Sequence, residues 1–261
     1  MRTVLTKGGL GVVLATGLML APALAHAQGR PPGISSDECK CQTATGKGQG
    51  KFVQSKQKCV TKCEQNARKG KEPAADCAPP YAGATASCVA KAETKAQQSE
   101  TKGCAKDCPE CYSGGNCSAD ARSRTDDTET QVDGFVPLIY CSPAPTDVDQ
   151  QKCQDTQAGE AAKFAAAKAT CYAECRDAEC KGKAAPGSCT PPASDAKTAA
   201  CISKAESKCA ANVDEKCPAA NVPACSAFTT GAALCGAIES AVDATDASTY
   251  CASPSGAFLD R

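Results

Sequence analysis

The fold is decided by the stretch from Cys41 to Cys88, which reads CQTATGKGQGKFVQSKQKCVTKCEQNARKGKEPAADCAPPYAGATASC. Its five cysteines are separated by 17, 3, 13 and 10 residues. A second stretch, from Cys153 to Cys201, has cysteine spacings of 17, 3, 13 and 11 residues. Five cysteines in register across an offset of about 112 residues indicate an internal duplication. The sequence therefore predicts two cysteine-rich repeats, over residues 39–146 and 147–261.

The N-terminus has the pattern of a cleavable export signal. Arg2 and Lys7 precede or flank an apolar run from Leu10 to Leu20, and Ala25-His26-Ala27 fits a small-x-small cleavage site. We expect residues 1–27 to be removed and residues 28–38 to form a flexible lead-in; the alternative is an uncleaved anchor. No later stretch is long and apolar enough for a membrane span. The sequence thus predicts a secreted or periplasmic protein, with a signal of bacterial type.

The composition of the mature chain is poor in large apolar residues and rich in cysteine. Ile, Leu, Val and Phe make up about 9% of the residues after position 27, whereas all 22 cysteines remain. So few apolar side chains are typical of disorder, but so many cysteines are typical of a disulfide scaffold. One cross-link stabilises a fold by ~2–4 kcal/mol. We therefore expect alanine and disulfides to replace the missing core, in an oxidising compartment.

The regions between the cysteines favour helices. Residues 150–179 contain no proline, one glycine and many helix-forming Ala, Lys, Glu and Gln. The predicted fold is all-α, with two tandem disulfide-stapled repeats that each hold an αα-hairpin and a third helix. The helices are expected at about 50–69, 84–102, 150–179, 194–212 and 225–242, and with a weaker pattern at 118–132. The one possible strand is residues 135–140.

Each αα-hairpin is expected to be cross-linked between its two helices. Counting outward from the loop predicts bridges Cys63–Cys88 and Cys175–Cys201, although spacing alone does not fix connectivity. The remaining cysteines that align between the repeats are also expected to be bridged: Cys41, Cys59, Cys77, Cys104, Cys111, Cys117 and Cys141, with Cys153, Cys171, Cys189, Cys217, Cys225, Cys235 and Cys251.

Four cysteines have no counterpart in the other repeat: Cys39, Cys108, Cys180 and Cys209. With them, each repeat holds 11 cysteines, which is an odd number. Pairing within repeats alone leaves one thiol in each. We favour one bridge between the repeats, and the alternatives are two free thiols or intermolecular bonds.

Several classes of function are excluded by missing residues. The only histidine, His26, lies in the predicted signal, so Ser-His-Asp and Cys-His catalysis are excluded in their usual forms. The chain has no P-loop or dinucleotide fingerprint. Its charge is nearly balanced, which argues against a nucleic-acid partner. We therefore expect a non-catalytic, cofactor-free structural or interaction protein, with a protein, glycan or envelope component as its unknown partner.

Two local patterns keep other functions open. Cys108-Pro-Glu-Cys111 contains a C-x-x-C, which suits thiol-disulfide redox chemistry, and with Cys104 and Cys117 it offers thiols to a soft metal. A purely structural knot is the third interpretation, and it is favoured because a thioredoxin-like site needs strands. A small-ligand binding module is a further alternative. The lysines between the cysteines, such as Lys56, are expected to form a solvated face.

Overall fold

The computed structural model describes residues 35–251, and in this range the chain is all-helical. Two short 3₁₀-helices, η1 (Ala74–Cys77) and η2 (Ala219–Asn221), precede α2 and α6. The predicted signal, residues 1–27, lies outside the described residues. None of the described helices is both long and apolar enough to cross a bilayer. The α-helices are α1 (Ser36–Arg68), α2 (Gly83–Gly103), α3 (Cys117–Ile139), α4 (Val148–Cys180), α5 (Ala196–Lys216) and α6 (Gly231–Thr249).

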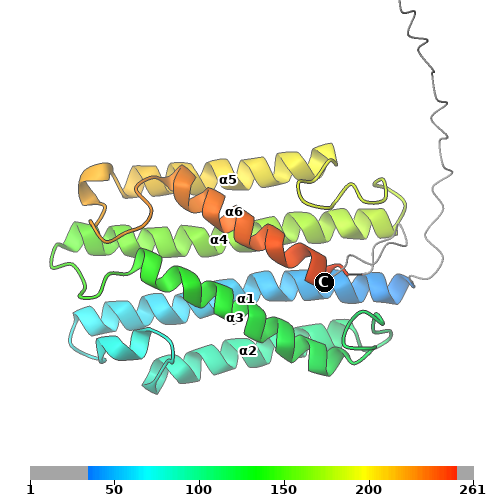
Figure 1. Cartoon of the computed structure of the whole chain (residues 1–261), viewed down its shortest axis with the longest axis horizontal. Coiled ribbons are helices and arrows are strands. Elements are labelled where there is room, and N and C mark those ends of the chain that lie inside the picture. The colour runs from blue at the N-terminus through cyan, green and yellow to red at the C-terminus, as the bar shows by residue number, and fades with distance from the viewer. Residues whose placement is uncertain (1–34, 252–261) are drawn as a thin grey trace, which may run out of the picture.

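The helices form two layers, as Figure 1 shows. Four helices lie side by side in the order α2, α1, α4 and α5, and α1 packs on α4 along most of its length. The other two, α3 and α6, run diagonally across one face of this layer. α3 packs on α2 and α1, whereas α6 packs on α5 and α4. The two halves of the chain therefore share one extensive interface through α1 and α4.

The two halves have the same order of helices. α1 and α4 each contain 33 residues, and α2 and α5 each contain 21. The chain passes from one half to the other between Ile139 and Val148, where Asp147 caps α4. That this arrangement arose by duplication, with the boundary between the repeats at residues 146 and 147, stays a prediction.

α1 begins earlier than the sequence predicts. Ser35 caps it and forms a capping box with Glu38, so residues 36–38 of the expected lead-in are helical. The helix then continues through the glycine-rich segment before Gly50, although glycine weakens helices. Packing overrides that propensity: a Cβ at Gly50 would lie 3.2 Å from the Ala166 Cα of α4. These glycines allow α1 and its neighbours to approach closely.

The third helices also differ from their predicted bounds. α3 extends to Ile139, and it includes most of the segment 135–140 that was the one strand candidate. α6 begins at Gly231, after the predicted start at residue 225, because the chain is irregular from η2 to Thr230. Thr230 caps α6 with its side chain. The apolar pattern of α3 is weak because α3 lies on the outer face of the four-helix layer, where one side of it is exposed to solvent.

The main hydrophobic cluster is assembled from both halves. It joins Val60 of α1 and Ile139 of α3 to Phe164 of α4, Val213 of α5 and Leu234 of α6. Alanines of α4 fill the space between these larger side chains. Such a core is thin for a chain of this length, so cross-links have to supply part of the stability.

All 22 cysteines lie within the described residues and are bonded in pairs, so none of them is a free thiol. The hairpin pairings differ from those predicted, because Cys63 bonds Cys77 and Cys175 bonds Cys189. The predicted bridges Cys63–Cys88 and Cys175–Cys201 are not formed. The bonds within the halves are Cys41–Cys104, Cys59–Cys88, Cys63–Cys77, Cys108–Cys117, Cys153–Cys217, Cys171–Cys201, Cys175–Cys189 and Cys209–Cys235.

The physical reason for this correction is the loop between the hairpin helices. Counting outward assumes a tight connection, but the loop after α1 holds η1, which ends at Cys77 and folds back on α1. Cys63, close to the loop, therefore meets Cys77, and Cys59, one turn earlier, meets Cys88 of α2. The corresponding loop in the second half brings Cys189 to Cys175 in the same way.

Three further bonds join the two halves. The odd number of cysteines in each half predicted at least one such bond. The three bonds are Cys39–Cys180, Cys111–Cys251 and Cys141–Cys225. Of the four cysteines without a counterpart, only Cys39 and Cys180 bridge the halves, whereas Cys108 and Cys209 bond within their own.

Candidate functional site

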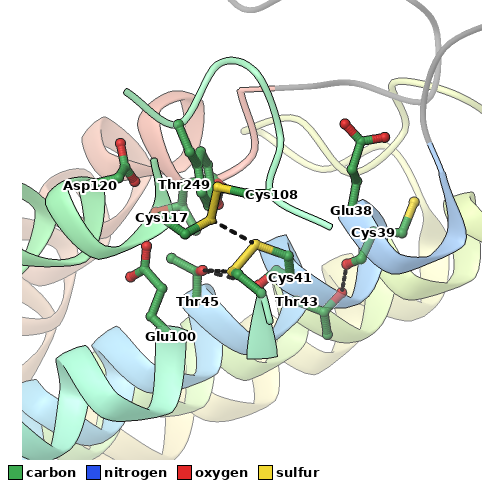
Figure 2. The surroundings of a disulfide bond; sticks show 12 residues. Glu38, Cys39, Cys41, Thr43, Thr45, Glu100, Cys108, Cys117, Asp120 and Thr249 are labelled. Atoms are coloured by element: carbon green, nitrogen blue, oxygen red, sulfur yellow. Dashed lines mark hydrogen bonds between the residues drawn. A yellow bond between two sulfur atoms is a disulfide. The ribbon is translucent and has the colours of Figure 1, made fainter. Parts of the chain in front are cut away.

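The Cys108-Pro-Glu-Cys111 motif lies in a buried cluster of disulfides at one end of the helical layer. The bonds Cys41–Cys104 and Cys108–Cys117 are neighbours, with 3.7 Å between the Sγ atoms of Cys41 and Cys117. Figure 2 shows Cys41, Cys108 and Cys117 in this cluster. Cys111 belongs to the same cluster, and it bonds Cys251. The motif is therefore bonded to the start of α3 and to the residue that follows Tyr250 at the end of α6, and the neighbouring bond Cys41–Cys104 joins α1 to the end of α2.

This pairing determines which chemistry the cluster can support. A redox centre of the C-x-x-C type needs Cys108 and Cys111 to bond to each other, but each is bonded elsewhere. The sulfurs of Cys41, Cys104 and Cys117 lie within 4.8 Å of one another, as metal ligands do. All three are consumed in disulfides, however, and only thiolates bind a metal strongly. In this oxidised form the cluster therefore has no free thiolate to offer a metal.

A groove lies between α3 and α6, on the face that Figure 1 turns to the viewer. α3 and α6 form its walls, and α1 and α4 form its floor. The cavity within it has a volume of about 90 Å³. Its apolar lining comes from Val53, Val132, Phe135, Ala165, Ala169, Ile238, Ala241 and Val242, and its polar lining comes from Gln49, Arg124, Asp127, Thr128, Gln131, Thr245, Ser248 and Thr249.

Disulfides between the halves fix both ends of this groove. Cys111 lies before α3 and bonds Cys251, just after the end of α6. Cys141 lies just after α3 and bonds Cys225, before the start of α6. Cys111 aligns with Cys225 in the sequence, and Cys141 aligns with Cys251. The two bonds are therefore reciprocal, and together they set the spacing of the two walls.

Arg124 marks the polar end of the groove. Its guanidinium is bonded to the Asp120 carboxylate, donates to the Ser248 carbonyl at the end of α6, and lies 3.9 Å from the centre of the Tyr112 ring. A further carboxyl oxygen, Glu100 Oε1, lies 3.8 Å from Arg124 Nε. The side chain of Arg124 is 6% exposed. Within the described structure, its Nη2 has no hydrogen-bond partner.

Each wall of the groove is tied to the floor by a buried lysine. Lys168 of α4 lies with its Nζ 2.8 Å from Glu239 Oε1 and 2.7 Å from Asp243 Oδ1, both on α6. The hydroxyl of Tyr172 donates to the same Asp243. Lys168 is 0% exposed, so its charge depends on these two carboxylates.

Lys56 of α1 makes the same connection to α3. Its Nζ lies 2.6 Å from Glu129 Oε1 and 2.5 Å from Asp133 Oδ1. The prediction that Lys56 belongs to a solvated face is wrong, because its side chain is 0% exposed. Here the tyrosine that donates to Asp133 is Tyr81, from the loop before α2.

Two buried carboxyls near the ends of the walls hold their protons more tightly than usual. Burial raises the pKa of the Glu100 carboxyl to about 7, although the nearby Arg124 opposes this shift. Burial also raises the pKa of the Asp246 carboxyl to about 6, against the opposing effect of Arg176. Deprotonation of either group at neutral pH therefore costs stability.

These shifts predict a fold that is more stable in mild acid than in mild base. The protonated carboxyls of Glu100 and Asp246 contribute to the free energy of unfolding. This contribution is fully present below the unfolded-state pKa values near 4, and it is lost as the pH rises through 6 to 7. The midpoint of guanidinium unfolding is expected to be higher at pH 5 than at pH 8. Glu100→Gln is expected to reduce that difference. A midpoint that rises from pH 5 to pH 8 contradicts the assignment.

Sequence reasoning missed the groove. Most of its lining residues are Ala, Val, Thr and Gln in no recognisable motif, and only the fold brings them together. The buried lysines left a signal that could have been found: Lys56 and Lys168 each follow a phenylalanine by four residues, at the same position of the repeated pattern. Comparison of the chain with protein-family models, with curated proteins and with solved structures finds no match.

Proposed function

We propose that this chain is an exported, non-catalytic binding protein that takes a small apolar ligand in the groove between α3 and α6. The observation that carries the proposal is the groove itself, with apolar side chains on its walls and floor. Small-molecule sites in proteins are concave, mostly apolar and furnished with a few polar groups. This groove has that composition, with several of its polar groups near Arg124 and Gln131 farther along α3.

The scaffold supports this proposal because it prevents the groove from collapsing. Apolar walls separated by a gap gain free energy by closing together. Here the reciprocal bonds Cys111–Cys251 and Cys141–Cys225 hold the wall ends, and Lys56 and Lys168 tie the walls to the floor. A preformed site loses little conformational entropy when it binds its ligand.

The test is a fluorescence titration of the oxidised mature protein with the apolar dye N-phenyl-1-naphthylamine. Because the dye is larger than the cavity of about 90 Å³, we expect one ring to enter it and the rest to lie along the open groove, with saturable binding and enhanced emission. Ala241→Trp, which places a large ring on the α6 wall, is expected to weaken dye binding at least tenfold because it fills the groove. The readout of folding is the far-ultraviolet circular dichroism of each variant.

The control is Ser240→Trp, the same ring on the adjacent residue. Ser240 is exposed on α6 and does not line the groove. It is expected to bind the dye as the wild type does. Equal dye binding by the wild type and by folded Ala241→Trp contradicts the proposed site, and so does a wild type that binds no dye.

A further inference from the structure

Buried polar atoms without partners at the Arg124 end of the groove indicate what the ligand's head group is. Arg124 Nη2 is a donor and Gln49 Oε1 is an acceptor, and each lacks a hydrogen-bond partner within residues 35–251, as do both carboxyl oxygens of Glu100. Arg124 and Gln49 line the cavity, whereas Glu100 lies behind Arg124 and does not line it. A buried polar group without a partner costs free energy, so a ligand that pairs with both atoms gains specifically from this end of the groove.

The charges around Arg124 determine whether that head group is ionised. Its positive charge is already matched by Asp120, and Glu100 faces it as well. Another carboxylate, Asp127, lines the groove nearby. A carboxylate head would therefore enter a site that has more acidic than basic groups, whereas an ammonium head would approach the guanidinium. At the buried end Arg124 is already paired with Asp120, and the buried Glu100 carboxyl, whose pKa is raised to about 7, is largely protonated below that pH, so neither ionised head finds a free counter-charge there.

We infer that the groove selects an uncharged amphiphile: an aliphatic chain or ring that carries a hydroxyl group. The hydroxyl accepts from Arg124 Nη2 and donates to Gln49 Oε1, which a single oxygen can do at once. The apolar part extends along α3 from Arg124 toward Phe135, a distance of about 16 Å along the helix axis. Val132, Ile238 and Val242 line this path. The inference rests on the proposed function, whose site it specifies.

The test compares three ligands with the same chain and different heads: 1-octanol, octanoate and octylamine. Each is titrated at pH 6, where octanoate and octylamine are ionised and Glu100 is largely protonated, against the wild-type protein loaded with N-phenyl-1-naphthylamine. We expect 1-octanol to displace the dye at a concentration at least tenfold lower than either ionised ligand. If octanoate or octylamine displaces the dye as well as 1-octanol does, the head-group inference is overturned while the proposed groove stands. If the dye does not bind, the proposed function fails first.

A pair of glutamine variants tests the hydrogen bond itself. Gln49→Leu removes the acceptor and is expected to weaken 1-octanol binding about five- to tenfold, the usual worth of one hydrogen bond. Gln54→Leu is the matched control, since Gln54 lies on the same helix but lines a separate cavity between α1 and α4. It is expected to leave 1-octanol binding unchanged. Equal affinities in the wild type and in Gln49→Leu overturn the assignment.

Discussion

Replacing Lys168 with methionine is expected to destabilise the fold by about 2–3 kcal/mol. The substitution keeps the aliphatic volume but leaves Glu239 and Asp243 together on α6 without their shared cation. Loss of one partner from a fully buried pair costs about 3–5 kcal/mol. We expect less here because the two carboxylates are 33% and 29% exposed, so water partly screens them. Chemical unfolding followed by circular dichroism measures the change.

Lys163→Met is the control for this effect. Lys163 is on the same helix and pairs with Glu160, but its side chain is 66% exposed. Surface pairs of this kind contribute at most about 1 kcal/mol. Neutralising both carboxylates in the Lys168→Met background, with Glu239→Gln and Asp243→Asn, is expected to restore part of the lost stability. Equal losses from the two lysine substitutions contradict the buried network.

Removing the Cys111–Cys251 bond is expected to impair both stability and ligand binding. In the Cys111→Ser/Cys251→Ser variant, α6 loses its covalent link to the segment before α3. The sequence separation is 140 residues, but the other cross-links shorten the effective loop, so we expect a loss of about 2–4 kcal/mol. Because this bond closes the polar end of the groove, dye affinity is expected to fall about tenfold, which is ~1.4 kcal/mol.

The comparison variant removes Cys59–Cys88, which joins α1 to α2 away from the groove. Cys59→Ser/Cys88→Ser is expected to lose stability and yet to bind the dye with wild-type affinity, measured well below its unfolding transition. If both variants lose affinity equally, the bond between the halves has no particular effect on the groove.

The sequence allowed the helical architecture to be predicted because local composition controls it. α4 shows this most clearly: its Ala, Lys, Glu and Gln content predicted residues 150–179, and the helix spans Val148–Cys180. The next helix was expected from about residue 194, and α5 begins at Ala196, where the side chain of Asp195 caps it. α1 was harder because contacts with α4 and α6 outweigh the low helix propensity of its glycines.

The groove and the bonds at its ends could not be predicted from local patterns. An odd number of cysteines in each half requires a bond between the halves, but it does not identify which cysteines take part. Cys111 could bond Cys141 of its own half or Cys251 of the other half. Either choice is compatible with an odd number of cysteines in each half, and the structure has the bond to Cys251. Only the positions of α3 and α6 distinguish them. The lining of the groove is likewise a product of tertiary packing.

The central claim is that reciprocal bonds between the halves hold the two walls of the groove, and disulfide mapping tests it most directly. Unreduced protein is cleaved after Lys, Arg and Glu and analysed by mass spectrometry, which places the four cysteines in separate peptides. The structure predicts that peptide 111–122 is linked to 240–261, and that 130–152 is linked to 217–239. Links of 111–122 to 130–152 and of 217–239 to 240–261 would contradict it.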